Sequence, residues 1–137
     1  MAQKAATVAI SLATVGAFGI MTAPSASAAT GYNGACGSGY KVVNELTDRL
    51  TRYYLTYNSS NGTNCVVAVY QNIGPKPVEM VATIIVNHVQ KADMGPYSSY
   101  AGPVYLKGAG FCVTWGGRVT YSNGETISTG ASNTNCG

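Results

Sequence analysis

The chain has 137 residues, of which 9% are charged, with eight Lys or Arg against five Asp or Glu and a formal net charge of +3. The basic residues are scattered along the chain, which argues against the concentrated positive patch that nucleic-acid-binding proteins use. A chain of this length accommodates one domain of ordinary size and no second one.

The first 28 residues have the composition of a secretory signal peptide. Lys4 supplies a positive start, the stretch that follows it is small and apolar without a charge, and 24–28 read Pro-Ser-Ala-Ser-Ala. Signal peptidases accept such small residues, so we expect cleavage near Ala28 or Ala29. Cleavage would leave 29–137 as a single secreted β-domain with no stable membrane span.

The first part of the remaining chain predicts a hairpin, preceded by an ambiguous stretch. Residues 39–43 fit a short strand. Within 44–51, apolar residues at helical spacing fit a turn or two of helix, whereas the flanking segments favour a strand, so both remain open. Segments 52–57 and 65–70 are rich in aromatic and β-branched residues, and the turn cluster between them contains Asn61-Gly62. These features predict a β-hairpin.

The later part of the chain predicts further short strands. Residues 78–86 are dense in Val, Ile and Thr and fit a buried strand, because consecutive β-branched residues disfavour a helix. An irregular segment that carries tyrosines begins at Met94. Two more hairpins are expected, one joining 104–107 to 111–115 and one joining 118–121 to 126–129. About seven short strands separated by turn signals indicate an all-β fold, an antiparallel β-sandwich or small barrel.

Four cysteines, Cys36, Cys65, Cys112 and Cys136, follow the predicted leader. In an exported protein such cysteines persist as disulfides. If neighbouring strands form meanders, Cys36 begins the first strand beside the end of the second, and Cys65 lies just past the next turn at the same end. The same reasoning places Cys136 beside Cys112. We therefore predict the disulfides Cys36–Cys65 and Cys112–Cys136.

The sequence carries no recognisable catalytic, cofactor-binding or metal-binding pattern. His88 is the single histidine, and no Gly-x-Ser-x-Gly turn accompanies it. Glu45 and Asp48 form the closest carboxylate pair, but each has an arginine four residues on, which favours ion pairing over acid–base catalysis. With the cysteines committed to disulfides, the ligands of a zinc site are lacking. We therefore expect a protein that is not an enzyme and uses no cofactor or metal.

Aromatic side chains gather in the last third of the chain. They are Tyr97, Tyr100, Tyr105, Trp115 and Tyr121. Aromatic faces stack on sugar rings and anchor protein interfaces, so these residues form a candidate binding face. Tyrosine also suits half-buried strand positions, so a purely structural use is the competing interpretation.

The orientation of Trp115 can be argued from strand alternation. Phe111 and Val113 share its face, which favours packing of Trp115 into the core. A disulfide buried in the core at Cys112 would reverse that assignment and turn Trp115 towards a ligand.

Several segments together resemble a known family. In chain order they are 36–40 (CGSGY), 54–58 (YLTYN), 64–67 (NCVV), 100–105 (YAGPVY), 112–117 (CVTWGG) and 135–137 (NCG). They resemble the spore-associated protein A family of filamentous, spore-forming Gram-positive bacteria, and the resemblance includes all four cysteines. It implies a small secreted protein found with the spore surface, and it supplies no catalytic residue.

These observations predict a secreted, non-enzymatic, disulfide-stabilised protein associated with the spore or cell surface. Its expected partners are components of that surface, and nucleic acid is not among them. Two alternatives remain open. One is a carbohydrate-binding or cell-wall-binding module that uses the tyrosine and tryptophan faces. The other is a small secreted inhibitor or antimicrobial protein, a role that two-disulfide β-domains often serve.

Overall fold

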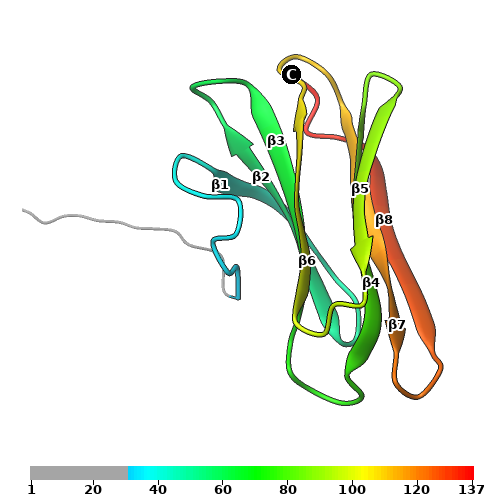
Figure 1. The fold of residues 1–137 in the computed structure, drawn as a ribbon. Helices are drawn as coiled ribbons and strands as arrows, with labels where there is room; N and C mark the ends of the chain where they lie inside the picture. The colour runs from blue at the N-terminus through cyan, green and yellow to red at the C-terminus, as the bar shows by residue number, and fades with distance from the viewer. Residues whose placement is uncertain (1–30) are drawn as a thin grey trace, which may run out of the picture.

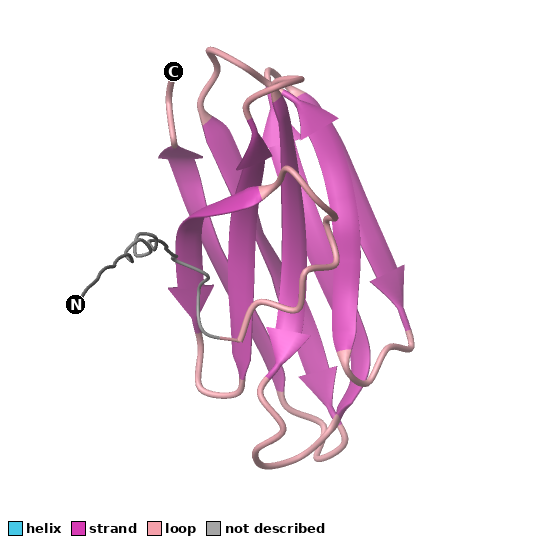
Figure 2. Ribbon diagram, turned by 90° about the vertical axis from the view of Figure 1, so that its left-hand side faces the viewer, coloured by secondary structure: helices cyan, strands magenta, loops and turns pink. Residues whose placement is uncertain are grey.

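Two four-stranded antiparallel sheets face each other in the computed structural model, which describes residues 31–137 (Figure 1). The predicted signal peptide, 1–28, lies outside the described residues. The strands are β1 (Lys41–Thr47), β2 (Thr51–Asn58), β3 (Thr63–Tyr70), β4 (Pro77–Val86), β5 (Val89–Gly95), β6 (Tyr100–Lys107), β7 (Val113–Tyr121) and β8 (Thr126–Thr134). Residues 31–137 contain no helix (Figure 2). The predicted all-β sandwich is confirmed.

The first sheet has the strand order β1-β2-β3-β6 and contains the predicted hairpin. β2 and β3 pair without a register shift from Thr51↔Tyr70 to Asn58↔Thr63. The turn between them uses Gly62 at a positive φ, a conformation that glycine adopts without steric cost. The ambiguous stretch 44–51 contains no helix: 44–47 completes β1, 48–50 connects the strands, and Thr51 begins β2, with which β1 pairs antiparallel.

The second sheet has the strand order β5-β4-β7-β8. β4 and β5 are joined by a two-residue turn, Asn87 and His88, and both residues have positive φ values of 49° and 67°. Such a turn matches the twist of paired strands. β5 has no strand signal in the sequence, because this edge strand is largely exposed and lacks an alternating apolar pattern.

One predicted hairpin is wrong. β6 pairs with β3 in the first sheet, whereas β7 pairs with β4 and β8 in the second, so 108–112 cross from one sheet to the other. The segments predicted as separate strands, 111–115 and 118–121, belong largely to the single strand β7. The β7–β8 hairpin is confirmed by the pairing of Val119 with Ile127.

Gly116 and Gly117 lie within β7 at a point where the backbones of both neighbouring strands approach closely. A Cβ atom on Gly117 would collide with the carbonyl oxygen of Val81 in β4, and one on Gly116 would collide with that of Thr129 in β8. The glycine pair therefore permits a close approach of the neighbouring backbones.

Large side chains from both sheets fill the space between the layers. Trp115 is 2% exposed and packs in this core, which confirms its predicted inward orientation. Its ring nitrogen donates a hydrogen bond to the hydroxyl of Thr134 at 3.1 Å. Phe111 does not share that environment: it lies before β7 begins and is 47% exposed. The predicted inward orientation is therefore confirmed for Val113 and Trp115 and is wrong for Phe111.

A second, smaller cluster lies on the outer face of the first sheet. The segment before β1 (cyan in Figure 1) contributes Cys36, which packs with Cys65 and Val67 of β3. The hydroxyl of Tyr105 donates a hydrogen bond to the carbonyl of Cys36 at 2.9 Å. Both predicted disulfides, Cys36–Cys65 and Cys112–Cys136, are confirmed.

Alkaline pH is expected to destabilise the fold through Tyr53. Burial of this side chain, together with the nearby carboxylate of Asp48 to which its hydroxyl donates a hydrogen bond at 3.2 Å, raises the pKa of Tyr53 well above its usual value. The unfolded chain, whose tyrosines titrate near about pH 10, therefore loses this proton first. The contribution of protonated Tyr53 to the free energy of unfolding is therefore complete below about pH 10 and declines as the pH rises further.

Urea unfolding at a series of pH values from neutral to strongly alkaline measures this effect. Tyr53→Phe lacks the titrating hydroxyl, so its free energy of unfolding should fall less steeply in the alkaline range than that of the parent protein. Equal slopes for the two proteins would contradict the assignment of the alkaline loss to Tyr53.

Candidate binding site

The five aromatic residues predicted to form a binding face do not lie on one surface. Trp115 and Tyr121 are buried in the core between the sheets. The hydroxyl of Tyr121 lies 2.6 Å from that of Thr51, which gives this buried phenol a polar partner. Tyr105 lies on the outer face of the first sheet, where its ring contacts that of Tyr40 at a centroid distance of 5.5 Å. Strand alternation turns the β7 aromatics inward.

Tyr97 and Tyr100 are the two members of the predicted face that the structure brings together. They line an open depression of about 420 Å³. The carboxylate of Asp93 accepts hydrogen bonds from the hydroxyl of Tyr97 at 2.7 Å and from the backbone N–H of Gly102 at 2.8 Å. The hydrogen bond to Asp93 raises the pKa of Tyr97. Tyr100 is 44% exposed, so its ring is available to a ligand.

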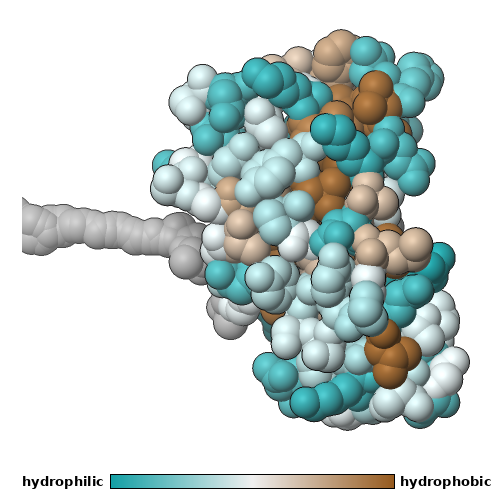
Figure 3. All heavy atoms as spheres, in the orientation of Figure 1, coloured by the Kyte–Doolittle hydropathy of each residue, from teal (hydrophilic) through white to brown (hydrophobic). Residues whose placement is uncertain are grey.

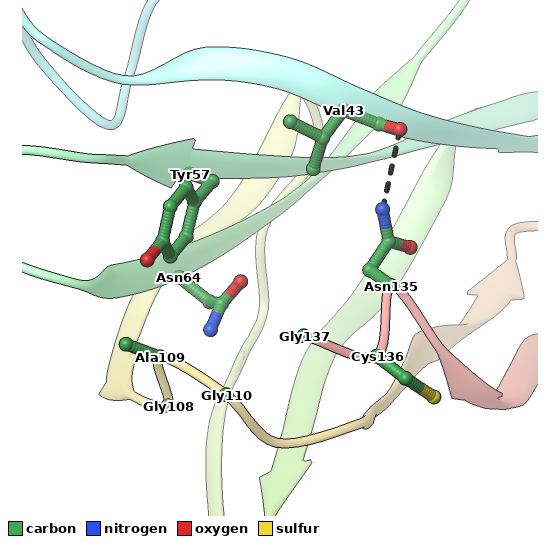
Figure 4. A pocket seen from close by; sticks show the side chains of 9 residues that line it. All are labelled: Val43, Tyr57, Asn64, Gly108, Ala109, Gly110, Asn135, Cys136 and Gly137. Carbon is green, nitrogen blue, oxygen red and sulfur yellow. Dashed lines mark hydrogen bonds between the residues drawn. The ribbon is translucent and has the colours of Figure 1, made fainter.

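A second pocket, of about 440 Å³, lies at one end of the sandwich between the two sheets. Its wall comes from β1, β2, β3, the 108–112 crossing and the C-terminal segment (Figure 4). The lining residues are Val43, Tyr57, Asn64, Gly108, Ala109, Gly110, Asn135, Cys136 and Gly137. None of these residues has a charged side chain, so their side chains offer no positive charge that could bind an anion.

Asn64 is the unusual residue of this pocket. It is 3% exposed, and its amide lies between Tyr57 and the 108–110 loop (Figure 4). Within residues 31–137 the side-chain amide makes no hydrogen bond. Buried polar groups in proteins are nearly always paired, and an unpaired one costs about 1–3 kcal/mol. By contrast, the buried Asn58 accepts hydrogen bonds from the backbone and hydroxyl of Ser60 at 3.0 and 2.6 Å.

The sequence did not reveal the pocket because Tyr57 and Asn64 occupy ordinary strand positions. Asn64 is paired with Tyr57 in the β2–β3 register. It shares the inner face of β3 with Val66 and Ala68, which belong to the core. A single amide on an otherwise apolar strand face is the signal that could have identified it.

The C-terminal segment closes one side of this pocket and is held in place by specific contacts. The side-chain amide of Asn135 donates a hydrogen bond to the carbonyl oxygen of Val43 at 3.4 Å (Figure 4). Its oxygen accepts one from the amide of Asn44 at 2.9 Å. The disulfide Cys112–Cys136 ties the same segment to the crossing between the sheets. The pocket wall is therefore fixed from two sides.

The residues weighed for catalysis lie apart from both depressions or already have partners. His88 lies in the exposed β4–β5 turn. Asp48 accepts hydrogen bonds from the backbone N–H groups of Leu50 and Thr51 at 2.8 and 2.7 Å. The described part of the chain holds no cluster of His, Cys, Asp and Glu that could bind a metal ion.

The expected ion pairs four residues apart do not form. The chain is not helical here and turns at 48–50 between β1 and β2, so the partners come from other segments. Arg52 pairs with Glu45 at 3.8 Å across neighbouring strands, and Arg49 pairs with Glu125.

Most of the face in Figure 3 is covered by hydrophilic or weakly polar residues, with a few hydrophobic residues between them. This face therefore offers no broad apolar patch of the kind that marks a protein–protein interface. Over residues 31–137, the search for a helix capable of crossing a membrane finds none.

The chain is similar to Spore-associated protein A of Streptomyces coelicolor (strain ATCC BAA-471 / A3(2) / M145). The two are 49% identical over an alignment of 117 residues, which covers 77% of this chain and 75% of the relative. No protein-family model matches the chain. No solved structure matches it either.

Proposed function

The chain belongs to the spore-associated protein A family, and from this membership we propose that it is a secreted, non-enzymatic protein that associates with the spore or cell surface. The observation that carries the proposal is the 49% identity to a relative named for its association with spores. The two disulfides also support it, because disulfides persist in oxidising compartments outside the cytoplasm.

The side-chain arrangement supports a non-enzymatic role. General acid–base catalysis requires titratable groups within reach of a substrate and free to exchange a proton. Asp93, whose carboxylate lines the depression of Tyr97 and Tyr100, already accepts two hydrogen bonds. His88 lies in a surface turn between β4 and β5, where its backbone geometry serves the hairpin. Surface components of the spore or cell wall are the proposed partners.

Fractionation of a spore-forming culture tests this proposal. An epitope-tagged chain should be recovered from the medium and from salt washes of spores and cells, and its intact mass should lack residues 1–28. A variant without these residues should stay inside the cell and serves as the control. Retention of the full-length mass in the cytoplasm would contradict the proposal. His88→Ala should associate with the surface as the parent protein does.

A carbohydrate-binding or wall-binding role is a second candidate, favoured by the depression that Tyr97 and Tyr100 share. The half-buried ring of Tyr97 and the exposed ring of Tyr100, next to hydroxyl groups, suit the stacking and hydrogen bonding that sugars require. Sedimentation with insoluble cell wall tests it. Tyr97→Ala combined with Tyr100→Ala should lose sedimentation, whereas Phe111→Ala, at an exposed aromatic outside the depression, should retain it. Equal sedimentation of both variants would count against this candidate.

A further inference from the structure

We propose that the pocket around Asn64 between the two sheets binds a neutral N-acetylated sugar. This site is distinct from the depression formed by Tyr97 and Tyr100, and it does not depend on where the protein is located. The inference begins from the side-chain amide of Asn64, which is 3% exposed and faces the pocket without a hydrogen-bond partner in the described part of the chain.

The chemistry of an unpaired amide favours a ligand with a strong hydrogen-bonding group of its own. The asparagine side chain presents two N–H donors beside one carbonyl acceptor. The carbonyl oxygen of an acetamido group can accept one of these N–H donors, while its N–H points the opposite way in the trans amide. One acetamido group therefore forms one hydrogen bond with Asn64, and the burial of the site protects that bond from competition by water.

The rest of the lining specifies a neutral sugar ring. Tyr57 offers an aromatic ring on which the C–H face of a pyranose can stack. Val43 and Ala109 offer apolar surface for the methyl group of the acetamide. Because the lining residues include no charged side chain, a phosphate or carboxylate would find no counter-charge. The volume of about 440 Å³ falls within the range of small-molecule sites.

The pocket is built in advance of binding. The crossing loop is held by hydrogen bonds from the N–H of Gly108 to the carbonyl of Gly62 and from the N–H of Phe111 to the carbonyl of Gly108, both at 3.0 Å. The opposite side is held by Asn135 and by the disulfide at Cys136. A ligand entering such a site orders little additional chain, which favours affinity.

Titration followed by NMR of the side-chain amide signals tests the inference. We expect N,N′,N″-triacetylchitotriose to shift the Asn64 amide resonances in a saturable manner. Cellotriose, which carries hydroxyls in place of the acetamido groups, should leave them unmoved. N-acetylalanine methylamide, a peptide amide without a sugar ring, should bind at least about tenfold more weakly. Equal shifts with cellotriose, equal or tighter binding of the peptide amide, or no shift with triacetylchitotriose would overturn the proposal.

Substitutions separate binding from folding. Asn64→Leu replaces the amide with an apolar group that has the same number and branching of heavy atoms, so we expect affinity to fall about tenfold or more while the melting temperature stays equal or rises. Val43→Trp, at a partly exposed position on the pocket wall, should block the pocket and abolish the shifts. Ile73→Ala, at an exposed position outside the pocket lining, is the matched control and should bind normally. Unchanged binding by Asn64→Leu, or by Val43→Trp, would overturn the site.

Discussion

Replacing Trp115 with alanine is expected to lower the free energy of unfolding by about 3–5 kcal/mol, the range for truncating a large aromatic side chain in a core. Trp115 is 2% exposed and lies opposite Ile84 in the β4–β7 register, at the centre of the layer between the sheets. The substitution leaves a cavity and also removes the hydrogen bond to the hydroxyl of Thr134. Urea unfolding monitored by circular dichroism measures the loss.

Two further variants divide this loss into its parts. Thr134→Val removes the hydroxyl partner while the ring stays in place, so it should cost about 1 kcal/mol. Phe111→Ala truncates an aromatic residue that is 47% exposed, and its effect should stay within about 0.5 kcal/mol. Comparable losses for Trp115→Ala and Phe111→Ala would show that Trp115 does not pack in the core.

Removing the disulfide Cys36–Cys65 should also have a large effect, about 3.5 kcal/mol from loop entropy alone. This disulfide closes a separation of 29 residues, and both cysteines are buried. It also holds the segment before β1 against the outer face of the first sheet, where Val67 is fully buried. The double variant Cys36→Ala/Cys65→Ala therefore loses a chain constraint and exposes apolar surface, so its total loss should exceed the entropic part.

The second disulfide provides a matched control. Cys112–Cys136 closes a separation of 24 residues, so its loop entropy is nearly the same, about 3.5 kcal/mol. Both of these cysteines are exposed, so Cys112→Ala/Cys136→Ala should cost the entropic part alone. Parallel urea unfolding of the two double variants measures the difference. If the exposed pair lost as much free energy of unfolding as the buried pair, or more, the segment before β1 would not stabilise the first sheet by covering its outer face.

Several structural features could be predicted because their signals are local. The turn with Asn61-Gly62 and the flanking aromatic and β-branched residues predicted the β2–β3 hairpin, which pairs without a register shift. Strand direction then placed Cys36 and Cys65 at one end of the sheet, and the same reasoning paired Cys112 with Cys136. Antiparallel neighbours bring the start of one strand beside the end of the next, so pairing follows once the strands are known.

Other features could not be predicted from local patterns. Gly108-Ala109-Gly110 has the composition of a hairpin loop, yet here it crosses between the sheets, because β6 finds its partner in β3 rather than in β7. Among the aromatic residues, Tyr97 and Tyr100 come together while Trp115 and Tyr121 are buried. Which aromatic residues share a surface depends on the sheet that each strand joins.

By itself the sequence determined that the fold is all-β, where the β2–β3 and β7–β8 turns lie and how its cysteines pair. Alternation of side chains along an extended backbone and the preference of glycine and asparagine for turns act over a few residues. The tertiary structure decided which strands share a sheet and left Asn64 buried without a partner in the described part of the chain. The pocket around Asn64 joins β1, β2, β3, the crossing and the C-terminal segment. The pocket forms only when residues distant in sequence pack together, because the burial of Asn64 and its lack of a hydrogen-bond partner depend on all the segments that surround it.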